Sequence, residues 1–98
     1  MTIRLTRQAE TDIENIAGYL IPRSPQGAMR VEAAIQEALA LIARYPAVGH
    51  ERRQRVRRFA LPRYPYLIFY RMNEVDNAIE VLAIRHAARK PEDPSDAH

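Results

Sequence analysis

The sequence predicts a two-layer α+β domain in which a hairpin of two helices packs on an antiparallel sheet. Two segments in the first half carry apolar residues at helical spacing, which indicates two amphipathic helices. The stretch 56–89 concentrates aromatic and β-branched residues, which favour strands. Because neither the helices nor the strands can bury their apolar faces alone, the two layers are expected to cover each other.

The length and composition indicate one globular domain. A chain of 98 residues with 47% hydrophobic content is long enough for a single core and too apolar for a disordered chain. We expect the domain to span residues 3–89. Residues 90–98 are polar and rich in proline and acids, and they are expected to form a frayed C-terminal tail.

The first half is expected to form a short strand, Thr2–Leu5, followed by the two helices. Thr6 is positioned to cap a helix from Arg7 to Leu20. Ser24 and Pro25 suit the cap and first position of a second helix that ends near Tyr45, before Pro46. The short link between them predicts an antiparallel αα-hairpin.

Three strands are expected in the second half, as an antiparallel meander. They are Val56–Leu61, Tyr66–Met72 and Ala78–His86, separated by proline-containing and polar turns. The short N-terminal strand should join this sheet at an edge. The predicted core contains the following residues: Ile13, Ile16, Leu20, Val31, Ile35, Leu39, Ile42, Phe69 and Ile84.

Positive charge is concentrated in the middle of the chain. The net charge is only +3, but residues 44–71 hold eight arginines and a single acid, Glu51. If the first meander strand extends backwards, Arg53, Arg55 and Arg57 would share one face, opposite Val56 and Arg58. Such a row could dock an acidic partner or a phosphate backbone, or it could be a solvated face.

The sequence contains no cofactor, metal or nucleotide motif, and no cofactor is expected. There is no cysteine, no glycine-rich phosphate loop, and the three histidines form no metal-binding pattern. No apolar run reaches the length of a membrane span, and no signal peptide is recognisable. We therefore expect a soluble cytoplasmic protein.

One group of residues resembles a ribonuclease site in composition. His86 could act as a general acid, and Arg71, Arg85 and Arg89 could hold a scissile phosphate. Tyr64, Tyr66 and Tyr70 could surround such a site. The alternative is that His86 is a structural residue at the end of a strand and that the tyrosines pack in the sheet.

The ordered motifs resemble the ParE/RelE superfamily of bacterial toxins, and its ParE branch most closely. The resemblance covers about residues 3–89. It is carried by three stretches of the sequence: AETDIENIAGYL in the first helix, LIARYPAVG after the second, and RRFALPRYPYLIFYR followed by IRHAAR in the meander.

This resemblance implies a toxin of a type II toxin–antitoxin system. ParE-like toxins are understood to act without chemistry of their own, by trapping DNA gyrase on cleaved DNA. RelE-like toxins instead cut mRNA on the ribosome, so an endoribonuclease is the alternative function. For either branch, a cognate antitoxin is expected to neutralise the toxin through an acidic segment that folds on binding, and to reach operator DNA itself.

The expected binding surface for the antitoxin or the target follows the basic and aromatic residues. Open sheet edges could accept an added strand, and a groove between the helices could accept an amphipathic helix. The candidate binding residues are Arg53, Arg55, Arg57, Arg58, Tyr66, Tyr70, Arg71, Arg85, His86 and Arg89.

Overall fold

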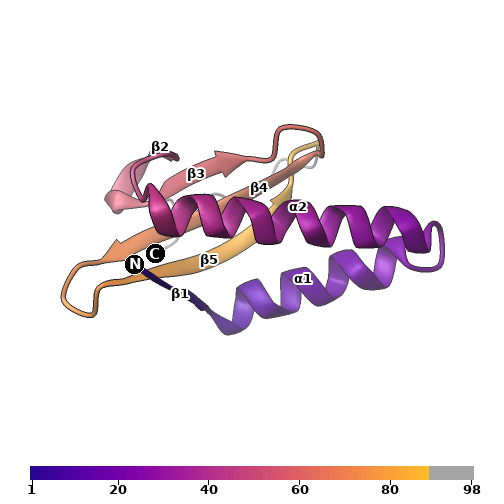
Figure 1. The fold of residues 1–98 in the computed structure, drawn as a ribbon, viewed down its shortest axis with the longest axis horizontal. Coiled ribbons are helices and arrows are strands. Elements are labelled where there is room, and N and C mark those ends of the chain that lie inside the picture. The colour runs from indigo at the N-terminus through magenta and orange to yellow at the C-terminus, as the bar shows by residue number, and fades with distance from the viewer. Residues whose placement is uncertain (89–98) are drawn as a thin grey trace.

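The computed structural model describes residues 1–88, and it has the predicted two-layer α+β architecture (Figure 1). The predicted tail 90–98 and Arg89 lie outside the described residues. In chain order the elements are β1 (Thr2–Leu5), α1 (Arg7–Leu20), α2 (Pro25–Arg44), β2 (His50–Glu51), the 3-10 turn η1 (Arg53–Arg55), β3 (Arg57–Ala60), β4 (Tyr66–Asn73) and β5 (Ala78–His86).

The strands form one sheet with the order β1-β5-β4-β3-β2. The pairs β2–β3, β3–β4 and β4–β5 are antiparallel, whereas β1 runs parallel to β5. The expected edge position of the N-terminal strand is therefore confirmed, and the edge is the one beside β5. Figure 1 shows both helices on the same side of the sheet.

Side-chain caps define where both helices begin, as the sequence predicted. The Thr6 hydroxyl accepts a hydrogen bond from the Ala9 N–H at 3.1 Å and also donates to the Val81 carbonyl at 2.9 Å. This hydroxyl thus joins the start of α1 to β5. The Ser24 hydroxyl accepts from the Gly27 N–H at 3.0 Å, and Pro25 occupies the first position of α2.

The core lies between α2 and the sheet. Five of the predicted core residues are buried there: Val31, Ile35, Leu39, Ile42 and Ile84. Phe69 is also buried, but in a separate small cluster on the opposite face of the sheet. Ile13, Ile16 and Leu20 of α1 are only half-buried against the core between α2 and the sheet. The reason is that α1 packs beside β5, next to the sheet edge, so one flank of its apolar stripe stays open.

The meander differs from the prediction at its first strand. β3 covers only Arg57–Ala60, and an additional strand, β2, precedes it. Between them Gln54 and Arg55 adopt left-handed backbone conformations, with φ of 56° and 62°. The chain reverses at these residues, so the predicted backward extension of the strand, with Arg53, Arg55 and Arg57 in one row, is wrong.

The two faces of the sheet are distinct. Along β4, Tyr66, Ile68 and Tyr70 face the helices, while Leu67 and Phe69 face away. A register shift between Phe69 and Tyr70 interrupts the β4–β5 pairing and increases the local twist. The face opposite the helices, which we call the open face, carries a small apolar cluster of Val56, Phe69 and Ala83, with Leu67 and Leu82 against it.

Candidate partner-binding surfaces

The most basic element is a β-hairpin formed by residues 50–58, which we call the arginine hairpin. His50 pairs with Arg58 and Glu51 with Arg57, and the Arg52 N–H donates to the Val56 carbonyl at 2.7 Å. The tip, residues 52–55, is exposed and holds three arginines. Because non-glycine residues rarely adopt left-handed conformations, the backbone at this tip is strained, a feature often found at functional sites.

Arg57 belongs to the base of this hairpin and not to its exposed surface. Its side chain is 17% exposed and lies 3.1 Å from the Glu51 carboxylate. Its guanidinium also donates to the Gly49 carbonyl at 2.7 Å and to the Ala47 carbonyl at 3.2 Å. Arg57 therefore holds the preceding loop, which removes it from the predicted row of binding residues.

Tyr70 ties the same loop to the core. Its hydroxyl accepts from the Gly49 N–H at 2.8 Å and donates to the Pro46 carbonyl at 2.7 Å. A Cβ on Gly49 would lie 2.6 Å from the Tyr70 oxygen, so only glycine fits this close contact. Burial raises the pKa of the Tyr70 hydroxyl, although the Gly49 hydrogen bond and the Arg57 charge act in the opposite direction.

Tyr66 and Tyr70, both predicted as binding residues, are buried beneath the helices. They are 6% and 0% exposed, respectively. In this conformation their side chains are therefore not accessible to a partner. Alternation along a strand separates two faces but does not indicate which of two apolar faces the helices cover.

The hydrogen bonds of Tyr70 lead to a stability prediction. Changing Tyr70 to Phe should lower the free energy of unfolding by about 1–3 kcal/mol at neutral pH, because the buried Gly49 N–H and the partly buried Pro46 carbonyl lose their partner. The ordinary tyrosine pKa is 10.0, and burial raises it in the folded state. Above pH 10 the unfolded chain ionises while folded Tyr70 keeps its proton, so wild-type stability falls as pH rises.

The difference in free energy of unfolding between wild type and Tyr70→Phe should therefore become smaller as pH rises above 10. Urea denaturation at neutral pH and at a series of alkaline pH values measures it. Tyr45→Phe is a matched control, because Tyr45 is 57% exposed. A constant difference between Tyr70→Phe and wild type across the alkaline range would contradict the prediction.

Of the possible ribonuclease site, the structure describes Arg71, Arg85 and His86, and it does not bring these three side chains to one place; Arg89 lies outside the described residues. Arg71 alternates onto the open face, where it is 3.7 Å from Glu80 of β5, whereas the guanidinium of Arg85 lies at the edge of β5, 3.4 Å from Asp12 of α1. His86 pairs with Tyr66 on the helix-covered face, where its ring meets the Tyr66 ring edge-on at 5.3 Å. The His86 Nδ1 accepts a hydrogen bond from the Ala88 N–H at 3.1 Å, a local strand-end contact.

Asp12 is a buried acid, although the spacing of apolar residues in the sequence places it off the stripe of α1. Its side chain is 7% exposed, and its carboxylate accepts from the Ile84 N–H at 2.9 Å and from Gln8 at 2.8 Å. Arg85 lies 3.4 Å from the same carboxylate. Asp12 thus covers the edge of β5 beyond the residues of β5 that pair with β1. It also lies beside Arg85, one of the predicted binding arginines.

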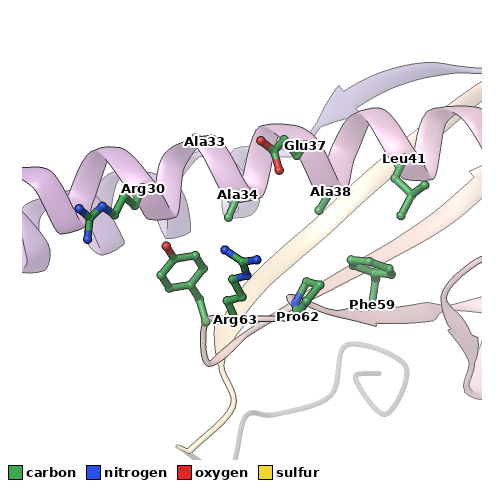
Figure 2. Close-up of a pocket in the computed structure, with 10 residues that line it drawn as sticks. Arg30, Ala33, Ala34, Glu37, Ala38, Leu41, Phe59, Pro62 and Arg63 are labelled. Carbon is green, nitrogen blue, oxygen red and sulfur yellow. The ribbon is translucent and has the colours of Figure 1, made fainter.

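A groove with a volume of about 580 Å³ lies between α2 and the β3–β4 connection (Figure 2), and we call it the α2 groove. One wall is α2, and the other is β3 with the turn that follows it. It is lined by Arg30, Ala33, Ala34, Glu37, Ala38, Leu41, Phe59, Pro62, Arg63 and Tyr64. The sequence predicted a groove between the two helices instead, and of these residues it singled out only Tyr64, as a possible neighbour of His86.

The described part of the chain gives two further results. Within residues 1–88, no group of three or more histidine or acidic side chains is placed to hold a metal ion. Neither α1 nor α2 has the length and apolarity to cross a membrane.

Comparison with known proteins identifies the family. The sequence model described as "ParE toxin of type II toxin-antitoxin system, parDE" matches residues 3–91. A protein of Sinorhizobium fredii (strain NBRC 101917 / NGR234) named "Putative toxin Y4kP" is 35% identical over 86 residues, which are 87% of this chain and 86% of that protein.

Two solved structures share the fold. The chromosomal ParDE toxin–antitoxin system of P. aeruginosa aligns with a TM-score of 0.75 at 22% identity, over 88% of this chain and 95% of that one. The RelBE2 toxin–antitoxin complex of Mycobacterium tuberculosis aligns with a TM-score of 0.59 at 22% identity, over 87% and 88% of the two chains. The sequence match over nearly the whole domain shows that this chain belongs to the ParE toxin family of type II toxin–antitoxin systems.

Proposed function

We propose that this toxin inhibits DNA gyrase in the cytoplasm and that a cognate antitoxin neutralises it by direct binding. Membership of the ParE family supports a gyrase target. The observation that carries this choice over mRNA cleavage is the position of His86. It packs against Tyr66 on the helix-covered face, whereas Arg71 pairs with Glu80 on the other face and the Arg85 guanidinium is held by Asp12 of α1 at the edge of β5.

A ribonuclease needs its general acid and its phosphate-binding cations around one phosphate. In this arrangement Arg71 lies on the opposite side of the sheet from His86, and Arg71 and Arg85 each already have a carboxylate close by. An inhibitor that acts by binding needs only an accessible surface. The arginine hairpin provides one, with exposed Arg53 and Arg55 at its tip and Arg58 half-buried behind them.

The arginine hairpin is also suited to an acidic antitoxin segment. Guanidinium groups pair bidentately with carboxylates, and a cluster of them raises the rate of association. Exposed pairs contribute only about 0–1 kcal/mol each, so no single arginine should dominate. Operator DNA would be contacted by the antitoxin and not by this chain.

The proposed function is tested with purified protein and with cells. The purified toxin should inhibit gyrase supercoiling and accumulate cleaved DNA, and stoichiometric antitoxin should reverse both effects. Induction of the toxin alone should arrest growth with filamentation and DNA-damage signalling. Primer-extension mapping of cellular mRNA tests the alternative function, mRNA cleavage. Codon-specific cuts that disappear in His86→Ala or Arg85→Ala would contradict the gyrase proposal and indicate that the toxin cleaves mRNA on the ribosome.

A further inference from the structure

We propose that the arginine hairpin binds the phosphate backbone of duplex DNA through Arg53, Arg55 and Arg58, so that the toxin holds DNA directly while it acts on gyrase. This inference rests on the proposed function, because a toxin that traps gyrase on cleaved DNA works beside a duplex. It adds a contact between this chain and DNA. The contact does not depend on base sequence, so recognition of the operator still belongs to the antitoxin.

The strand register places part of the hairpin on the open face of the sheet. Arg58 pairs with Phe69, whose side chain belongs to the open-face cluster, so Arg58 lies on that face too. His50 is directly opposite Arg58 and shares its face. β2 is the edge strand on this side (Figure 1), so no further strand of the sheet lies beyond His50. Both side chains are therefore directed away from the helices.

The tip of the hairpin adds uncompensated positive charge. Residues 52–55 are all exposed and include three arginines. Within residues 1–88, neither Arg55 nor Arg58 forms an ion pair. Glu51, the only acid between residues 44 and 71, lies 3.1 Å from Arg57 and is already paired. Guanidinium groups in this state are suited to the charged oxygens of a phosphate, which they can bind bidentately.

The other charges of the open face balance one another. The register places Glu80 opposite both Arg71 and Arg4, and its carboxylate lies 3.7 Å from the Arg71 guanidinium. Asp76, in the β4–β5 turn, lies 3.1 Å from Arg4. These two acids and two arginines cancel in net charge, so they leave the positive charge of the arginine hairpin in place.

The hairpin is held in one conformation before any ligand binds. The Arg52 N–H donates to the Val56 carbonyl at 2.7 Å, and the Val56 N–H donates to the Arg53 carbonyl at 3.1 Å. The Val56 side chain is 2% exposed and is buried in the open-face cluster. Because the backbone of the tip is already ordered, less conformational entropy is lost when its arginines bind a ligand.

A phosphate backbone matches this surface better than an acidic peptide does. The exposed residues 50–55 are all polar or charged, and Val56, the apolar residue of the hairpin, is buried. Stable protein–protein contacts depend on side chains anchored in well-packed pockets, which residues 50–55 do not offer. Binding to DNA phosphates needs only suitably placed cations, and it is driven by the release of counterions.

The test uses the full-length toxin without antitoxin and, as the probe, a short fluorescent DNA duplex of arbitrary sequence. Fluorescence anisotropy gives the affinity between about 50 and 200 mM salt. Changing Arg53, Arg55 and Arg58 together to Gln should weaken binding by about 10- to 100-fold at the low-salt end. The slope of log affinity against log salt should become shallower by about three, roughly one for each arginine.

A control variant removes the same charge from the helices. Arg7, Arg23 and Arg30 are exposed on or beside α1 and α2, and changing all three to Gln should leave the salt slope unchanged. Lysine at the three hairpin positions should preserve the slope, because it keeps the charges. Thermal melting verifies that each variant folds. If the hairpin Gln variant does not fold, Arg53→Gln with Arg55→Gln alters only the exposed tip and should make the slope shallower by about two.

Several results would overturn the inference while the proposed function stands. They are a wild-type toxin that binds the antitoxin but no duplex, and equal DNA affinities and salt slopes in the hairpin and control variants. Equal amounts of cleaved DNA from gyrase with these two variants would also overturn it, because the hairpin variant should need a higher concentration. Failure of the proposed function looks different, since wild-type toxin would then leave gyrase supercoiling unchanged whether or not it bound DNA.

Discussion

Changing Ile35 to Ala is expected to lower the free energy of unfolding by about 2–5 kcal/mol. Ile35 is 2% exposed and lies on the face of α2 that packs on the sheet. The change removes apolar contacts and leaves a cavity, which the surrounding helix and strands can fill only in part. Urea denaturation followed by circular dichroism measures this loss directly.

The matched control is Met29→Ala on the same helix. Met29 is 69% exposed, so its truncation removes little buried surface and should change stability by no more than about 0.5 kcal/mol. If Ile35→Ala and Met29→Ala unfolded at the same urea concentration, α2 would not pack on the sheet through the face that carries Ile35.

The elements with strong periodicity could be predicted from the sequence almost to the residue. α1 occupies the predicted range, α2 ends one residue earlier than expected, and β5 is as predicted. In these segments the caps, the proline breaks and the spacing of apolar residues all favour the same structure. When local signals agree with the global fold in this way, tertiary packing does not shift the ends of the helices and strands.

The arginine hairpin could not be predicted because its turn lacks the usual signal. Tight hairpins normally place Gly, Asn or Asp where the backbone is left-handed, whereas this one uses Gln54 and Arg55. β2 contains only two residues, too few for any alternation to be visible. The run of arginines was visible, but its orientation depended on a reversal that the sequence did not indicate.

The α2 groove escaped prediction for a different reason. Its walls come from residues 30–41 and 59–64, and only the packed fold brings these segments together. Ala33 and Arg63, taken singly, are ordinary surface residues. The burial of Tyr66 and Tyr70 was hidden for a related reason, since Leu67 and Phe69 on the opposite face are equally apolar.

Asp12 was missed because acids on helices are usually solvated, and nothing in the sequence shows that α1 lies against the free edge of β5. A strand edge has unpaired N–H groups, and a carboxylate held beside one satisfies it. The same carboxylate lies near Arg85, whose buried Nε atom has no hydrogen-bond partner among residues 1–88. Asp12 therefore stabilises both a backbone donor and a guanidinium.

Changing Asp12 to Ala should accordingly lower the free energy of unfolding by about 2–3 kcal/mol, since it leaves the Ile84 N–H and the Arg85 charge without their acceptor. Asp12→Asn should cost less, because an amide oxygen can still accept from Ile84 although it lacks the charge that attracts Arg85. Glu14→Ala is the control, being exposed on the same helix and without an ion pair in the described part of the chain.

Hydrogen exchange at the Ile84 amide distinguishes the role of Asp12 from a general loss of stability. The amide should exchange faster in Asp12→Ala than global unfolding of that variant explains, because its local acceptor is gone. Asp12→Asn should retain most of the protection. If Asp12→Ala instead matched Glu14→Ala in both stability and exchange, α1 would be held to β5 by the Thr6 hydroxyl and the apolar stripe alone, and the buried carboxylate would contribute nothing to that contact.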